Sequence, residues 1–108
     1  MELVQVNQEI YESTKRLREG SKNLFPLARI KAEAERDYRK ALAIEIMRLR
    51  DEGRPATLIS DIARGNLSDI KFKRDLAEIR YQAARDSLIA IREQMSGLQT
   101  IVKHLSEV

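Results

Sequence analysis

The sequence contains no cysteine and no tryptophan, and only one of its 108 residues is histidine. The absence of cysteine excludes disulfide bonds, thiolate zinc sites and thiol catalysis, and it fits a reducing, cytosolic compartment. Aromatic residues make up only 5% of the chain. This composition favours helices that pack through leucine, isoleucine and alanine over a β-sandwich.

Residues that break helices are also scarce, with four glycines and two prolines in the whole chain. No apolar run approaches the ~20 residues that a membrane-spanning helix needs, and the first residues lack the basic and apolar segments of a signal peptide. The 20 basic and 17 acidic residues are interspersed and give a net charge of +3. Mixed charges of this kind indicate solvated helix surfaces, so we expect one globular domain over residues 1–108 with no membrane contact.

The first half of the chain carries an apolar stripe at helical spacing. Positions three and four residues apart alternate over residues 3–41, which places these side chains on one face of a helix. Gly20 and Pro26 interrupt the sequence but not the phase of the stripe. We therefore expect one long helix over residues 1–52, kinked near residues 20–26 because proline removes a backbone hydrogen bond.

Residues 41–49, with the sequence ALAIEIMRL, are apolar around most of the helix. Such a segment is typically buried by more than one neighbour. Gly53 is expected to end the helix, because glycine readily adopts the left-handed conformation found just after a helix end. The bend over residues 53–67 contains a short amphipathic helix at residues 57–63, which we expect to pack as a third element of the core.

The last helix is expected over residues 68–106, after Gly65 ends the short helix and Asn66 or Ser68 caps the next one. Its apolar stripe alternates four and three residues without a fault over residues 77–105. The two long stripes together predict an all-α fold. We expect a long antiparallel helical hairpin that resembles a coiled coil, with the short third helix at its bend.

The stripes also predict how the two long helices pair. A hairpin centred on the bend places Leu42 near Ala77 and Tyr38 near Tyr81. With only one seam, such a hairpin buries little surface in the half that lies far from the bend. We therefore expect a homodimer through a self-association seam formed by Leu3, Val6, Ile10, Leu17, Leu98, Val102 and Leu105.

Residues that could perform catalysis or hold a metal are sparse. His104 has a single carboxylate, that of Glu107, at helical spacing, so we expect a surface residue rather than a metal ligand. Acidic side chains elsewhere have basic neighbours three or four residues away, which is typical of solvated ion pairs. No glycine-rich phosphate-binding motif and no nucleophile motif occurs. We therefore expect no enzyme activity, no cofactor and no metal site.

Basic residues gather around the bend, together with nearly as many acidic ones. A surface that follows nucleic-acid phosphates concentrates unopposed lysine and arginine on one face. The small surplus here favours protein–protein contact as the function, with direct DNA or RNA binding as the alternative. In either case the candidate interaction surface consists of Arg48, Arg50, Arg54, Arg64, Lys71, Lys73 and Arg74.

Residues 41–84 resemble an uncharacterised family of small helical proteins from phages and prophages of Gram-positive bacteria. The matching parts are the RLRDEG helix end, the LISDIARG bend and the FKRDLAEIRY start of the last helix. Proteins of that group tend to be encoded among early genes, beside recombination and replication functions. The resemblance implies a non-catalytic phage accessory protein in the bacterial cytoplasm that binds a replication, recombination or host-defence protein. A further alternative is an anti-defence inhibitor, similar in role to anti-CRISPR proteins.

Overall fold

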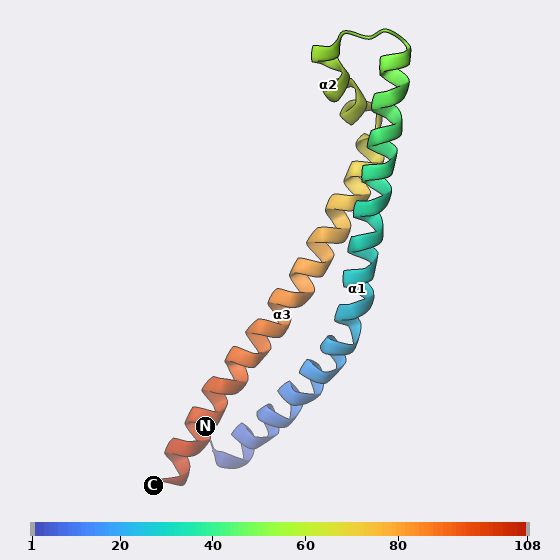
Figure 1. Cartoon of the computed structure of the whole chain (residues 1–108). Coiled ribbons are helices and arrows are strands. Elements are labelled where there is room, and N and C mark those ends of the chain that lie inside the picture. The colour runs from blue at the N-terminus through green and yellow to red at the C-terminus, as the bar shows by residue number, and fades with distance from the viewer. Residues whose placement is uncertain (1, 108) are drawn as a thin grey trace. The chain divides into compact units, whose positions relative to one another are not determined.

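A computed structural model describes residues 2–107, which form three helices and no strand. Helix α1 spans Leu3–Asp51, α2 spans Ala56–Asn66 and α3 spans Ser68–Ser106 (Figure 1). Helix α1 packs against α3 as a hairpin, with the short α2 at the bend. The predicted fold class is therefore confirmed. None of the helices in the described part of the chain is long and apolar enough to cross a membrane.

The chain forms two compact units. The bend unit, Leu27–Tyr81, contains the second half of α1, all of α2 and the start of α3. The terminal unit contains the described residues 2–26 and 82–107, which belong to the start of α1 and the remainder of α3. Each unit therefore has its own contact between α1 and α3.

Helix α1 is continuous through Gly20 and Pro26. Proline has no N–H, so the carbonyl four residues before Pro26 lacks its usual helical donor. Gly20 serves the packing of the terminal unit, because a Cβ at this position would lie 2.6 Å from Cδ2 of Leu88 on α3. The predicted kink near residues 20–26 falls at the boundary between the two units and stays a prediction.

Helix α1 ends in a Schellman motif. Gly53 has a positive φ of 77°, and its N–H donates to the carbonyl of Arg50 at 3.0 Å. The N–H of Arg54 donates to the carbonyl of Leu49 at 3.2 Å. These two bonds satisfy carbonyls that the helix end would otherwise leave free. Gly53 therefore ends α1 as predicted, because a residue with a Cβ is strained at this φ.

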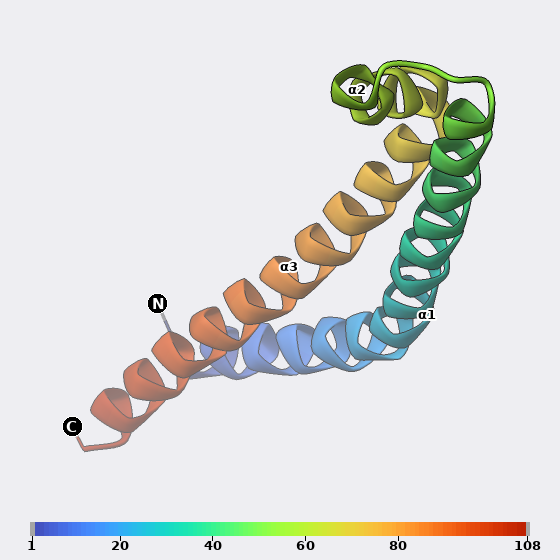
Figure 2. The ribbon, with the colours of Figure 1, turned by 45° about the horizontal axis from the view of Figure 1, so that its top comes forward.

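Helix α2 packs on the C-terminal part of α1 (Figures 1 and 2). The buried cluster at this contact consists of Leu49, Ile59 and Ala63. Three partly buried side chains pack against it: Leu42, Ile46 and Ile62. The short helix is a packed third element of the core, as its apolar spacing predicts. It also extends beyond the predicted residues 57–63 at both ends.

Part of the apolar segment at residues 41–49 is exposed, so the expectation that it is buried on most sides is wrong. Leu49 is buried, whereas Ile44 and Met47 are 65% and 63% exposed. Helix α2 covers one face of this segment. The apolar side chains that point away from α2 remain in solvent.

The connection between α2 and α3 is a single residue, Leu67. Gly65 does not end α2 and Asn66 does not cap α3, because both lie inside α2. The side-chain Nδ2 of Asn66 instead donates to Oε1 of Glu45 on α1 at 3.2 Å. The N–H of Leu67 donates to the carbonyl of Ala63 at 3.1 Å, so backbone groups close the end of α2.

The register of the hairpin differs from the predicted one by two helical turns. Glu35 and Tyr38 of α1 both contact Arg74 of α3, and Lys31 lies over the ring of Tyr81. The predicted pairing of Tyr38 with Tyr81 is therefore wrong by one heptad. The shift follows from α2, which packs on the end of α1 and leaves α3 to begin beside an earlier turn of α1.

Candidate functional site: two grooves of the bend unit

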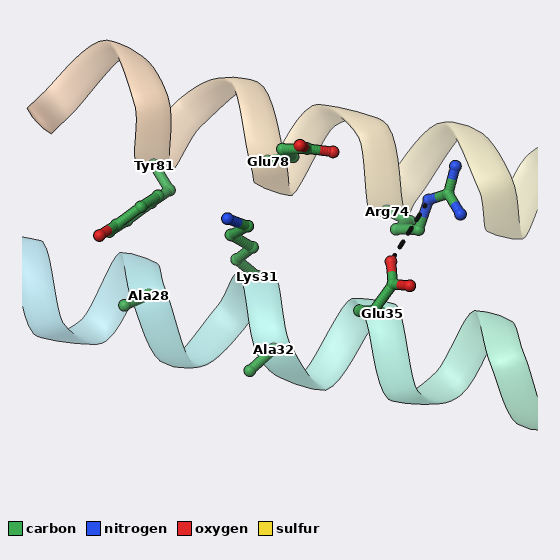
Figure 3. A pocket seen from close by; sticks show the side chains of 7 residues that line it. All are labelled: Ala28, Lys31, Ala32, Glu35, Arg74, Glu78 and Tyr81. Atoms are coloured by element: carbon green, nitrogen blue, oxygen red, sulfur yellow. Dashed lines mark ion pairs between the residues drawn. The ribbon is translucent and has the colours of Figure 1, made fainter. Parts of the chain in front are cut away.

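The larger groove of the bend unit lies between α1 and α3 (Figure 3). Its volume is about 620 Å³. Lys31 on α1 and Tyr81 on α3 point toward each other, and Nζ of Lys31 lies 4.9 Å from the centroid of the tyrosine ring. We call this the tyrosine groove, and its lining residues are Ala28, Lys31, Ala32, Glu35, Arg74, Glu78 and Tyr81.

Arg74 joins the two helices at the edge of the tyrosine groove. Its guanidinium lies 4.3 Å from the ring centroid of Tyr38, its Nε lies 3.6 Å from Oε2 of Glu35, and its Nη2 lies 2.9 Å from Oδ1 of Asp75. The hydrogen bond to Asp75 is the main cause that raises the pKa of Arg74. The pKa of Asp75 is lowered first by its hydrogen bond from Lys71 and then by the one from Arg74. These contacts hold both partners in their charged forms.

Glu78 is the free negative charge of the tyrosine groove. Within residues 2–107, its carboxylate forms no ion pair. On the α1 side, Ala28 and Ala32 are too short to fill the space. The groove therefore offers two small apolar side chains, an aromatic ring that Lys31 faces, and a carboxylate that an external cation can reach.

A second groove, of about 310 Å³, lies between different faces of the same two helices. Both of its acidic residues, Glu33 and Asp37, belong to α1, and both of its basic residues, Lys73 and Arg80, belong to α3. The opposite signs therefore stand on opposite walls. We call this the charged groove, and its lining residues are Ile30, Glu33, Ala34, Asp37, Lys73, Leu76, Ala77 and Arg80.

Large apolar side chains border the charged groove. Ile30 lines it and is 50% exposed. Phe72 and Ile79 share a face of α3 with Leu76, since they lie four and three residues away, and they are 67% and 63% exposed. Ile44 lies further along the same face of α1. The charges of this groove therefore sit within an exposed apolar surface.

The basic surface predicted at the bend is largely neutralised by neighbouring carboxylates. Arg48 pairs with both Glu45 and Glu52, and its hydrogen bond is the main cause that lowers the pKa of Glu45. Arg54 lies 3.5 Å from Oε2 of Glu52. The residues of this basic surface that form ion pairs are Arg48, Arg54, Lys71 and Arg74. Those that form none among residues 2–107 are Arg50, Arg64 and Lys73.

The predicted self-association seam lies in the terminal unit, and most of it packs inside the chain. Val6 and Leu98 are buried, and Leu3 is exposed. These residues hold α1 against α3, and self-association through them stays a prediction. The half-buried members of the seam are Ile10, Leu17, Val102 and Leu105.

Neither groove follows from the sequence pattern. The carboxylates of Glu33, Glu35 and Asp37 have local basic neighbours, which is typical of a solvated face. Tyr38 and Tyr81 occupy stripe positions and were expected to meet each other. Each tyrosine instead meets a cation of the opposite helix. A lysine or arginine opposite a tyrosine on the other helix is the sequence signal that could have located these contacts. It can be used only when the register of the two helices is known.

Comparison of the chain with family models, with curated proteins and with solved structures found no match. Within residues 2–107, no group of three or more histidine, aspartate or glutamate side chains is placed to hold a metal ion. His104 is exposed on α3. The two grooves of the bend unit bring charged, aromatic and small apolar side chains of α1 and α3 together.

Proposed function

We propose that this chain is a non-catalytic protein that acts by binding another protein. The observation that carries the proposal is the tyrosine groove, which has a volume of about 620 Å³. A tyrosine, two alanines and four charged side chains line it, and among residues 2–107 the carboxylate of Glu78 forms no ion pair. Grooves of this kind accept an amphipathic helix whose apolar side chains enter the groove. The fitting partner is a helical segment that packs an apolar side chain on Tyr81 and places a lysine or arginine beside Glu78.

The electrostatics of the described residues support a binding role. The pKa values of four groups are clearly shifted, and each shift favours the charged form. A general acid or base instead needs a pKa near the operating pH. These four charges are thus suited to holding positions rather than to transferring protons. The four groups are Glu45, Arg48, Arg74 and Asp75.

The resemblance of residues 41–84 to phage and prophage proteins supplies the setting of this proposal. We propose a phage accessory protein that works in the bacterial cytoplasm. Its partner is a replication, recombination or host-defence protein. If the partner is a host-defence protein and binding blocks its surface, the chain acts as an anti-defence inhibitor.

Direct binding of DNA or RNA has weaker support. Among residues 2–107, only Arg50, Arg64 and Lys73 of the basic surface lack an ion pair. Retention on single- and double-stranded DNA at increasing salt tests this alternative, because the affinity of a phosphate-binding surface falls steeply with salt. Absence of retention at low salt excludes it.

A photo-cross-linking amino acid at position 32 tests the tyrosine groove directly. Ala32 is an exposed residue of this groove, and Ala43 is an exposed alanine of the same helix outside both grooves. In phage-infected host cells we expect a defined protein adduct at position 32 and none at position 43. Glu78→Lys reverses the free charge and should reduce the adduct about tenfold, which corresponds to ~1.4 kcal/mol. Equal labelling at both positions, or an adduct insensitive to Glu78→Lys, contradicts the proposal.

A further inference from the structure

The charged groove has a pattern that a copy of itself can complete. The contact between Glu35 and Arg74 sets the register of the two helices, so Asp37 stands level with Lys73. By the same register, residue 33 stands level with residue 77, so Arg80 lies three residues, or about 4.5 Å, beyond the level of Glu33. Each wall of the groove therefore carries two charges of one sign, opposite to those of the other wall, with one pair level and the other offset by about one helical turn.

These charges have no partner across the groove. Lys73 and Arg80 form no ion pair among residues 2–107, and Glu33 and Asp37 pair only with arginines of their own helix. Those two local pairs are exposed, and exposed pairs contribute little to stability. The groove is therefore free to form stronger pairs with an external surface of the same pattern.

The solvent-accessible surface area of the chain is large enough for such a contact. It exposes 8159 Å², whereas a compact monomer of 12.5 kDa exposes about 6,200 Å². The excess of about 2,000 Å² exceeds the ~800 Å² that each partner contributes to a standard interface. Beside the charged groove, this exposed surface includes Ile30, Ile44, Phe72 and Ile79.

We propose that a second copy of this chain covers the charged groove, so that two bend units form a two-fold symmetric four-helix bundle. With the two-fold axis parallel to the helices, α1 of one copy lies against α3 of the other. Asp37 then faces Lys73 of the partner subunit. Arg80 of the partner subunit lies about one helical turn from the level of Glu33, a distance of about 4.5 Å that the long arginine side chain can span. Each helix is antiparallel to both of its neighbours, as in many four-helix bundles.

The charges also select this arrangement over the other face-to-face one. A two-fold axis perpendicular to the helices would place α1 against α1 and α3 against α3. Acidic walls would then meet acidic walls, and such like-charge contacts oppose association. The tyrosine groove stays open in the proposed dimer, because other faces of α1 and α3 line it. The dimer is independent of the proposed function and presents two copies of that groove.

Charge reversal of one wall at a time tests the dimer. E33K/D37K makes the groove wholly positive, and K73E/R80E makes it wholly negative. By sedimentation equilibrium we expect a wild-type dimer, a dissociation constant raised about 100-fold or more for each variant alone, and a tight heterodimer in the equimolar mixture. Circular dichroism checks that both variants remain helical. A wild-type monomer at all concentrations, or a mixture that stays monomeric, overturns the proposal.

The two phenylalanines of the chain provide a matched test of the apolar surface. Phe72 borders the charged groove, whereas Phe25 belongs to the terminal unit and is 74% exposed. Phe72→Ser should weaken the dimer about tenfold or more, since buried aromatic side chains dominate interfaces. Phe25→Ser should leave the dissociation constant unchanged. Equal weakening by both substitutions overturns the placement of the interface.

The absence of cysteine makes the orientation of the two copies testable. A chain with Asp37→Cys mixed with a chain carrying Lys73→Cys should form a disulfide-linked heterodimer under mild oxidation. Either chain alone should cross-link more slowly, because these positions lie diagonally across the bundle from their own copies. Faster cross-linking of Asp37→Cys with itself indicates the perpendicular axis and overturns the proposed arrangement.

Discussion

The bend unit and the terminal unit are built from the same two long helices but bury them differently. In the bend unit, α2 adds a second direction of packing, and Leu49, Ile59 and Ala63 form a buried cluster. In the terminal unit, α1 and α3 have only each other, and the fully buried side chains are those of Val6 and Ser13. A third helix of only 11 residues is thus enough to build a local core, because helical stability comes mainly from tertiary packing.

Electrostatics separate the two units as well. Every ion pair formed among residues 2–107 lies in the bend unit. In the terminal unit, Nη2 of Arg16 donates to Oε1 of Gln94 across the hairpin at 3.4 Å, and the remaining contact is mostly apolar. The bend unit should therefore respond to pH, and the terminal unit to changes in side-chain volume.

A charged side chain placed in the core of either unit is expected to have the largest effect on stability. Leu49→Asp in the bend unit and Leu98→Asp in the terminal unit each introduce a carboxylate without a partner, at a cost of roughly 3–5 kcal/mol. By hydrogen exchange we expect Leu98→Asp to remove protection from the terminal unit only, since the bend unit has its own buried cluster. Leu49→Asp should remove protection from the bend unit. Loss of protection throughout the Leu98→Asp chain would show that the units do not fold separately.

A larger side chain at Gly20 should destabilise the terminal unit. Because a Cβ there meets Cδ2 of Leu88 at 2.6 Å, the larger side chain of Gly20→Val displaces Leu88 or separates the two helices, at a cost of about 1–3 kcal/mol. Gly97→Val is the matched control, since a Cβ at Gly97 meets nothing within 4 Å. Urea unfolding monitored by circular dichroism measures both. Equal effects at the two positions would mean that α1 and α3 do not approach closely at Gly20.

Alanine at Gly65 should stabilise the bend unit. Gly65 lies inside α2, and a Cβ there meets nothing within 4 Å. Gly65→Ala is therefore expected to raise the free energy of unfolding by ~0.5–1 kcal/mol. Gly53→Ala should have the opposite sign, because φ at Gly53 is positive. Thermal unfolding distinguishes them, and a loss of stability in Gly65→Ala would place Gly65 outside a regular helix.

The smallest expected effect is a loss of stability of the bend unit as the pH falls into the acid range. Lys71 and Arg74 lower the pKa of Asp75 in the folded chain, so this carboxylate stabilises the fold at pH values above its unfolded pKa of about 4. The contribution is lost as the pH falls through the lower, folded value. Urea unfolding at pH 7 and pH 3 should therefore show a smaller loss in Asp75→Asn than in wild type. Asp61→Asn is the matched control, because this exposed carboxylate forms no ion pair with any residue from 2 to 107. An equal change in both variants would contradict this role.

Much of the fold could be predicted because it depends on residues close together in the chain. The apolar stripes predict the long helices through their spacing, and Gly53 predicts the end of α1 through its backbone freedom. The apolar face of the bend segment predicts that α2 packs on the core. The capping prediction at Asn66 was wrong because its side chain forms a hydrogen bond to Glu45, which lies on another helix.

The grooves could not be predicted, because they depend on which turns of α1 and α3 face each other. Arg74 reaches Glu35 and Tyr38 only in the observed register. The same limit applies to exposure. The segment at residues 41–49 is apolar on most sides, so its sequence alone does not predict which apolar side chains, such as Ile44, remain exposed to solvent.

Local sequence therefore dictates which residues are helical, where α1 stops and which stripe of each long helix turns inward. Tertiary packing decides the register, and with it the tyrosine groove and the charged groove. The physical reason is the heptad repeat itself, which matches itself after a slide of seven residues and satisfies either register equally well. The packing of α2 against Leu49 breaks this degeneracy, because it occupies the end of α1 and sets where α3 can begin.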